Sequence, residues 1–331
     1  MSLRDFNGPL FIVGMPRSGT KLLRTLLNTS STVFIPDVET HFLPYWFKHW
    51  EVYGDLSDPD QFRQFYDGVI NLPYFLYTGE FQANIDCKEW HSNCETYDLP
   101  GVFEALVKHD AGYPVNSGGV WGDKTPSYLG HMLLLKALFP TARFLHIVRD
   151  ARDYCLSMQN AWGKSLLRAA QMWNDGVTAA ITQGEALGDA YMQVRYEDLI
   201  SNPQAQLVQV CDFIGVPFEE QMLSLDSIPE NLGDTKGVRQ IVSNNVEKYR
   251  TRMDSEVRMR IESIACVPMK SLGYPIEYTG TPRRLSAAEM GLFKLHDGLN
   301  LIRFELGNRN IFEAARLRWR LYSVSGNRSR S

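Results

Sequence analysis

The sequence contains no long hydrophobic run. None of its 331 residues lies in a stretch approaching the roughly 18 consecutive apolar residues that a membrane-spanning helix needs. Asp5 and Asn7 interrupt the N-terminus before the apolar core of a signal peptide could form. Internal repeats and low-complexity tracts are also lacking, and a composition with 44% hydrophobic and 22% charged residues is ordinary for globular proteins. We therefore expect a cytoplasmic protein with no membrane span.

Cysteine is scarce. Five cysteines in a long chain are an odd number and too few for a disulfide scaffold, so we expect reduced, buried thiols. Cys87, His91 and Cys94 have the spacing of part of a zinc site, but they supply only three ligands and no fourth is evident nearby. We therefore expect no metal.

The sequence also has no excess of positive charge, because the formal net charge is −4. Residues 303–331 contain seven arginines and two glutamates, a balance of +5 that leaves −9 on the rest. An acidic body disfavours nucleic acid as a partner. We interpret residues 281–322 as a helical C-terminal appendage and residues 323–331 as a flexible tail.

Short apolar strands alternate with amphipathic helices, which predicts an α/β fold with a parallel sheet flanked by helices. We expect strands over residues 10–13, 32–35, 144–148 and 191–195, with helices over 131–138 and 150–158 and a further one after Pro203. Residues 44–120 interrupt this pattern, and twelve of the 38 residues in 44–81 are aromatic. We interpret 44–120 as an insertion within one domain over residues 1–280. We expect its aromatic rings to form the core of a helical cap rather than a wall that binds a ligand.

The strongest local motif lies between the first strand and the first helix. Gly14 and Gly19 have the spacing of a phosphate-binding loop, in which backbone N–H groups and the helix N-terminus face an anion. The two following residues are inverted relative to the nucleotide-binding pattern: Thr20 stands at the phosphate lysine's position, and Lys21 replaces the Mg²⁺-binding hydroxyl. The sequence therefore predicts a P-loop-like fold that binds a phosphate- or sulfate-like group without a metal, with Arg17 supplying charge.

Three other segments carry polar groups at expected strand ends. Arg149 follows the 144–148 strand, and Ser157 lies on the next helix, which places both at the sheet edge where α/β proteins bind ligands. Alternatively, Arg149 pairs with Asp153 at the helix start. Lys124 lies in what reads as a polar turn at residues 122–126, just before a helix, and Glu39 follows the second strand. Taken separately, Lys124 is explained as a surface charge, and Glu39 as a solvated carboxylate in a loop or at a helix start.

Taken together, these segments are more specific. The Pro-Arg-Ser-Gly-Thr loop, the Arg-Asp-x-Arg-Asp segment with its serine, and Arg-Tyr-Glu-Asp-Leu occur in the order that resembles the sulfotransferases using 3′-phosphoadenosine 5′-phosphosulfate (PAPS). The resemblance implies that the loop binds the 5′-phosphosulfate and that the arginine and serine after the central strand bind the 3′-phosphate. The donor-binding residues that it implies are Arg17, Ser18, Gly19, Thr20, Lys21, Arg149, Ser157, Tyr196 and Lys248.

The chain is more similar to the tyrosylprotein and glycan branch of that family than to the small-phenol branch. Glu39-Thr40-His41 resembles a Glu-Thr-Arg segment that carries the catalytic base, and Lys124-Thr125-Pro126 resembles a turn that carries a catalytic lysine. The resemblance thus implies that Glu39, Lys124 and Arg17 are catalytic. His41 stands in place of an arginine and is a rival base.

The implied activity is in-line transfer of a sulfuryl group from PAPS to a hydroxyl or amine. The acceptor is a small molecule, a glycan or a peptide, and we interpret the insertion at residues 44–120 as lying on the acceptor side. The sequence does not indicate the oligomeric state. One alternative is a small-molecule kinase using ATP and Mg²⁺, which shares the loop spacing but requires the lysine and hydroxyl in order. Another is a non-catalytic nucleotide-binding module.

Overall fold

The sheet at the centre of the molecule is parallel throughout. The computed structural model describes residues 6–79, 82–114, 118–225 and 234–308. Within them, five strands pair in the order β2-β3-β1-β4-β5, and every pairing is parallel. The strands are β1 (Leu10–Gly14), β2 (Val33–Phe34), β3 (Val120–Lys124), β4 (Arg143–Val148) and β5 (Tyr191–Arg195). The predicted α/β class is confirmed.

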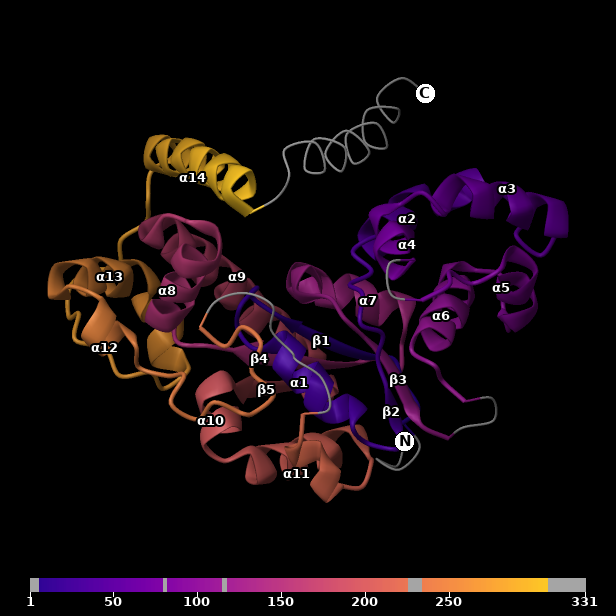
Figure 1. Ribbon diagram of the computed structural model, residues 1–331, viewed down its shortest axis with the longest axis horizontal. Helices are drawn as coiled ribbons and strands as arrows, with labels where there is room; N and C mark the ends of the chain where they lie inside the picture. Colours follow the sequence, from indigo (N-terminus) through magenta and orange to yellow (C-terminus); the bar gives the residue numbers. More distant parts are fainter. Residues whose placement is uncertain (1–5, 80–81, 115–117, 226–233, 309–331) are drawn as a thin grey trace.

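Helices cover both faces of the sheet (Figure 1). Successive residues of β1 alternate between the two apolar cores, so Leu10 and Ile12 join one core while Phe11 and Val13 join the other. The first core is closed by α1 (Thr20–Asn28), α10 (Tyr196–Ser201) and α11 (Pro203–Ile214). The second is closed by α7 (Met132–Leu138), α8 (Ala151–Trp162), α9 (Leu166–Leu187) and α13 (Ser255–Ser271).

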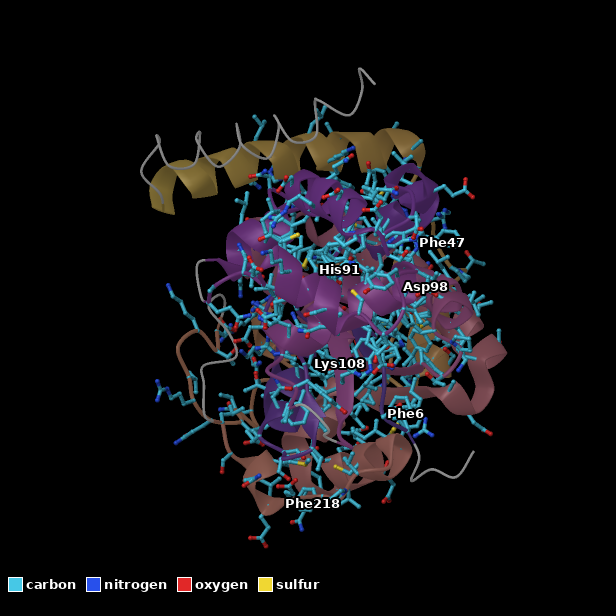
Figure 2. The ribbon with its side chains drawn as sticks, turned by 90° about the vertical axis from the view of Figure 1, so that its right-hand side faces the viewer. Phe6, Phe47, His91, Asp98, Lys108 and Phe218 are labelled. Carbon is cyan, nitrogen blue, oxygen red and sulfur yellow. The ribbon has the colours of Figure 1, made fainter. Side chains whose placement is uncertain are left out.

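A helical lobe lies between β2 and β3 in the chain and to the right of the sheet in Figure 1. It consists of α2 (Leu43–His49), α3 (Pro59–Val69), α4 (Pro73–Thr78), α5 (Cys87–Asn93) and α6 (Leu99–Asp110). Figure 2 views this side, with His91 of α5 and Lys108 of α6 labelled. Trp46, Phe65 and Trp90 are buried and in ring contact with other aromatic side chains. The aromatic-rich sequence is therefore the core of this lobe.

The prediction of a polar turn at residues 122–126 is wrong, because strand β3 extends to Lys124. Lys124 pairs with Ile12 of β1, and Gly122 pairs with Leu10. A Cβ on Gly122 would lie 2.2 Å from the Leu10 carbonyl oxygen, so a glycine lets the two backbones approach. The polar residues Asp123 and Lys124 are buried at the carboxyl end of this strand.

After α13 the chain forms α14 (Ala287–Asn308), which packs against α8 and α9. Asp297 of this helix accepts hydrogen bonds from the Ser165 backbone N at 2.7 Å and from Arg168 Nη1 at 2.7 Å. Residues 309–331, including the predicted tail, lie outside the described residues. No helix in the described ranges has the length and apolar character to span a membrane. The remaining helices are α12 (Tyr249–Arg252) and the 3-10 segments Trp50–Tyr53, Pro126–His131, Gly188–Ala190 and Glu220–Leu223.

Candidate active site

The loop between β1 and α1 turns tightly at two left-handed residues. Arg17 has φ 70° and Gly19 has φ 98°. A Cβ on Gly19 would lie 2.5 Å from the ring of Tyr196, so both the conformation and the close packing require glycine. The Ser18 N–H donates to the Met15 carbonyl at 3.1 Å, while Ser18 Oγ is buried and has no hydrogen-bond partner in the part of the chain that the structure describes. This loop directs backbone N–H groups and the start of α1 toward the carboxyl edge of the sheet.

The segment after β4 joins this loop. Arg17 Nε donates to Ser157 Oγ of α8 at 3.3 Å. Arg149 Nη1 donates to the Arg17 carbonyl at 3.4 Å, and its guanidinium lies 4.6 Å from the ring centroid of Tyr196. Two cationic groups and a hydroxyl from separate elements thus converge. The alternative ion pair between Arg149 and Asp153 is not present among the described residues. Arg149 donates to backbone carbonyls, and Asp153 accepts from the Tyr249 N–H.

These groups border a pocket, here called the main pocket, with an empty volume of about 690 Å³ including its open mouth. Six predicted donor-binding residues line it: Arg17, Gly19, Arg149, Ser157, Tyr196 and Lys248. Ser18 and Thr20 are instead buried beneath the loop, and Lys21 is half-buried on α1 outside the lining.

Much of the outer wall was missed by the sequence analysis. It is formed by the irregular segment 234–249, which contributes Asp234, Thr235, Val238, Gln240, Val242, Asn245 and Lys248. Asn245 links this wall to the rest of the pocket, because its carbonyl accepts from Arg149 Nη2 at 2.9 Å and its Nδ2 donates to Tyr196 Oη at 2.6 Å. Apart from Lys248, which the resemblance implies, the segment has no periodicity or motif, so the rest of this wall is identified only by its contacts.

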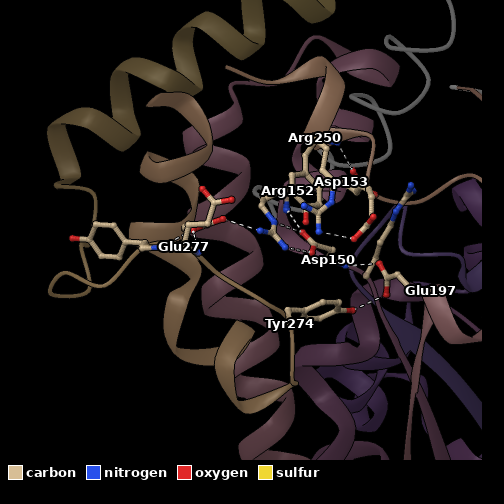
Figure 3. A network of polar contacts seen from close by, with 12 residues as sticks. Asp150, Arg152, Asp153, Glu197, Arg250, Tyr274 and Glu277 are labelled. Atoms are coloured by element: carbon tan, nitrogen blue, oxygen red, sulfur yellow. Dashed lines mark hydrogen bonds and ion pairs between the residues drawn. The ribbon is translucent and has the colours of Figure 1, made fainter. Parts of the chain in front are cut away.

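A buried arginine of α8, Arg152, joins the end of this wall to α8 and α13 (Figure 3). Arg152 bonds both oxygens of Asp150, at 3.0 and 2.6 Å, and donates to Glu262 Oε1 of α13 at 2.7 Å. Its guanidinium also lies 3.8 Å from the ring centroid of Tyr249. Asp153 Oδ1 accepts from the Tyr249 N–H at 3.0 Å. The residue that follows Lys248 is therefore held from two sides.

A second polar cluster lies where β2 and β3 end. Lys124 Nζ is bonded to Glu39 Oε1, and Glu39 Oε2 lies 2.9 Å from His41 Nε2. His41 Nδ1 in turn lies 2.9 Å from Ser127 Oγ. The Thr40 N–H donates to Thr125 Oγ1 at 3.0 Å, so the two segments are tied by backbone as well as side chains.

Charge and burial oppose each other in this cluster. Burial raises the pKa of Glu39, but the hydrogen bond from His41 and the charge of Lys124 outweigh it and bring the pKa to about 2. Burial lowers the pKa of Lys124; Glu39 opposes that shift, and the charges of Arg24 and Lys21 add to it. Lys124 pairs with Ile12 of β1, two residues before Gly14 at the end of that strand, so the Glu39–Lys124 pair lies next to the start of the loop.

The three candidate zinc ligands do not form a metal site. Cys94 Sγ donates to the Trp90 carbonyl at 3.2 Å, and His91 Nε2 lies 3.2 Å from the Ser57 carbonyl. In the described ranges, no group of three or more His, Cys, Asp or Glu residues is arranged to hold a metal ion. All five cysteines are buried free thiols.

Comparison with known families agrees with this arrangement. Residues 9–220 match the model of a family described as the sulfotransferase family. The chain belongs to the sulfotransferase family. This match covers the loop, the Glu39–Lys124 pair, the β4 segment and Tyr196, and it ends before the 234–249 wall.

The curated relatives of this chain include proteins that are named protein-tyrosine sulfotransferases. Protein-tyrosine sulfotransferase A of Caenorhabditis elegans is 26% identical over 222 residues, covering 65% of this chain and 51% of that protein. Protein-tyrosine sulfotransferase 1 of Danio rerio is 25% identical over 236 residues, covering 69% of this chain and 58% of its own length. The chain thus spans between half and three-fifths of these relatives.

Solved structures share the fold. A sulfotransferase domain from the Synechococcus PCC 7002 olefin synthase has a TM-score of 0.56 at 24% identity, covering 82% of this chain and 97% of that one. A sulfotransferase domain from the curacin biosynthetic pathway has a TM-score of 0.52, also at 24% identity, with 81% and 98% covered. The parallel sheet and its helical layers are therefore the sulfotransferase fold.

Proposed function

We propose that the protein transfers a sulfuryl group from PAPS to an acceptor hydroxyl, with the donor in the main pocket. The observation that carries this proposal is that Arg17, Arg149, Ser157 and Lys248 line one pocket, while the Glu39–Lys124 pair lies at the end of β3, the strand that pairs with β1 and so adjoins the loop. Several cations from separate elements suit a ligand with several anionic groups. Ser18 Oγ is buried and has no hydrogen-bond partner among the described residues, so it is a further donor that an anionic ligand can use.

The residues at the two ends of this site have different tasks. Arg149 and Ser157 would hold the 3′-phosphate, while the loop and Arg17 would hold the 5′-phosphosulfate, which supplies the sulfuryl group. Positioning and charge stabilisation dominate transfers of this kind. In this proposal Lys124 neutralises the charge that develops on the bridging oxygen as the sulfur–oxygen bond breaks.

Glu39 is the proposed base, and its pairing controls its basicity. With a pKa of about 2 it is a weak base while Lys124 and His41 both contact it. If Lys124 turns toward the reacting group, the pKa of Glu39 rises and it can accept the acceptor's proton. His41 is the more exposed of the two candidates, and its contact with Ser127 holds its ring in place.

The acceptor that we propose to test first is a tyrosyl hydroxyl on a peptide, because two relatives are named protein-tyrosine sulfotransferases. The helical lobe begins two residues after His41, with α2 at Leu43, so an acceptor that reaches Glu39 would lie against this lobe. We therefore assign the insertion at 44–120 to the acceptor side of the site.

Ligand-dependent thermal unfolding tests the donor assignment. The ligands are 3′,5′-adenosine bisphosphate, which is the desulfated donor, and ATP with and without Mg²⁺. At about 100 times its Kd, a ligand stabilises the fold by about 2.7 kcal/mol, which shifts Tm clearly. We expect a shift with the bisphosphate that is independent of Mg²⁺. A shift only with ATP and Mg²⁺ would favour the kinase, which the inverted loop residues Thr20 and Lys21 disfavour.

A further inference from the structure

A half-exposed carboxylate lies in the lining of the main pocket, together with the cations Arg17, Arg149 and Lys248. Asp234 Oδ2 accepts from Lys248 Nζ at 2.6 Å and from Arg252 Nη1 at 2.6 Å. Lys248 and Arg252 lie one helical turn apart at α12, so a single oxygen bridges both. Asp234 and Lys248 both line the main pocket. An acidic side chain in this position calls for a physical account, because it repels an anionic ligand.

The second acid of the pocket has a different environment. Asp153 is buried, with 2% of the residue exposed, and it accepts from the Tyr249 N–H, so it holds backbone. The Asp234 side chain is 35% exposed, and it forms ion pairs with Lys248 and Arg252. The hydrogen bond from Lys248 lowers the pKa of Asp234, so the carboxylate is charged when it bridges them.

We propose that Asp234 is an internal competitor for the 3′-phosphate of the donor, and this inference rests on the function proposed above. In the ligand-free protein the Asp234 carboxylate neutralises Lys248 and Arg252. A phosphate carries more charge and three acceptor oxygens, so it displaces the carboxylate when the donor binds. Asp234 thereby determines how tightly the site retains any ligand with a 3′-phosphate.

This competition affects donor and product equally, because both carry the 3′-phosphate. Weaker binding of the desulfated product shortens its residence time, and product release limits turnover in many enzymes. Asp234 thus sets the affinity for ligands with a 3′-phosphate, and it acts through Lys248 and Arg252.

Isothermal titration of the full chain with 3′,5′-adenosine bisphosphate tests this inference. Asp234→Asn keeps the shape of the side chain and removes its charge, and we expect Kd to fall about two- to fivefold, the factor that exposed ion pairs correspond to. Asp234→Ser is a second variant with the same expected direction. The matched control is Glu247→Gln, which removes one charge from the same segment. Glu247 pairs with Arg250 at 2.9 Å and lies outside the pocket lining.

Two further titrations locate the effect. Affinity for adenosine 5′-monophosphate, which lacks the 3′-phosphate, should not change in Asp234→Asn. Adding Lys248→Met to Asp234→Asn should remove the gain, since the competitor and its main cation are then both absent.

Weaker binding in Asp234→Asn, or a change no larger than that in Glu247→Gln, would overturn the inference and make Asp234 a structural brace. If the unsubstituted chain does not bind the bisphosphate at all, the proposed function fails together with this inference. Binding without a gain in the variant overturns the inference alone.

Discussion

Glu39→Gln separates stability from chemistry at the acceptor end of the site. The substitution keeps the side-chain shape but leaves Lys124, which is 1% exposed, without its counter-charge. Removing one partner of a fully buried pair costs about 3–5 kcal/mol. The Glu39 side chain is 26% exposed, so water can partly replace it. We expect the free energy of unfolding to fall by about 1–3 kcal/mol, measured by urea denaturation at pH 7.

The effect on catalysis should be far larger. Loss of a general base typically slows turnover by about 10²- to 10⁴-fold, and we expect this for Glu39→Gln with PAPS and a tyrosyl peptide. Affinity for the bisphosphate should remain within about twofold, an energy near 0.4 kcal/mol, because Glu39 does not line the main pocket. The matched control is Asp37→Asn, two residues away, whose side chain is 78% exposed and paired with Arg24.

Two results would refute this reasoning. If Glu39→Gln keeps turnover within about tenfold of the unsubstituted protein while His41→Ala abolishes it, His41 is the base. If Glu39→Gln with Lys124→Met is no more stable than Glu39→Gln alone, then the unpaired lysine is not the cause of the destabilisation.

Three further predictions concern the donor end and the pH dependence. Arg149→Ala should raise the bisphosphate Kd by roughly tenfold to a hundredfold, since a hydrogen bond to a charged group is worth about 1.5–3 kcal/mol; an unchanged Kd would refute the 3′-phosphate assignment. Gly19→Ala should lower stability by about 1–3 kcal/mol in urea denaturation, because of its left-handed backbone and the contact with Tyr196; an unaltered unfolding midpoint would contradict that packing. Glu39 has its pKa lowered from 4.5 to about 2, so the stability it contributes is present above about pH 4.5 and is lost as pH falls toward 2. As the pH falls below 4.5, the free energy of unfolding measured in urea should therefore fall more steeply for the unsubstituted protein than for Glu39→Gln.

The parts of the site that the sequence predicts are those encoded locally. An apolar strand that ends in Gly14, followed by a helix, specifies the loop, and β4 followed by Arg149 specifies the facing edge. Residue spacing alone predicts that these segments meet, because the carboxyl ends of parallel strands share one edge. The pairing of Arg17 with Ser157 across 140 residues follows from that topology.

The outer wall could not be predicted in this way. Segment 234–249 has no regular element before α12, so neither helical nor strand periodicity identifies it. Its position follows from contacts made by Arg149 with the Asn245 carbonyl and by Asp153 with the Tyr249 N–H. These are hydrogen bonds to backbone, which any residue type could accept or donate, so they leave no signature in the sequence.

Strand β3 shows why a local pattern can mislead at a functional site. Gly122, Asp123 and Lys124 have low strand propensity, and their sequence is typical of a turn. Burying Lys124 beside β1 costs desolvation, which its lowered pKa reflects, and the bond to Glu39 offsets part of that cost. A fold that only needed stability would place an apolar residue there. A buried charge at a strand end is typical of a functional position, and we propose that the function of Lys124 is in the transfer reaction.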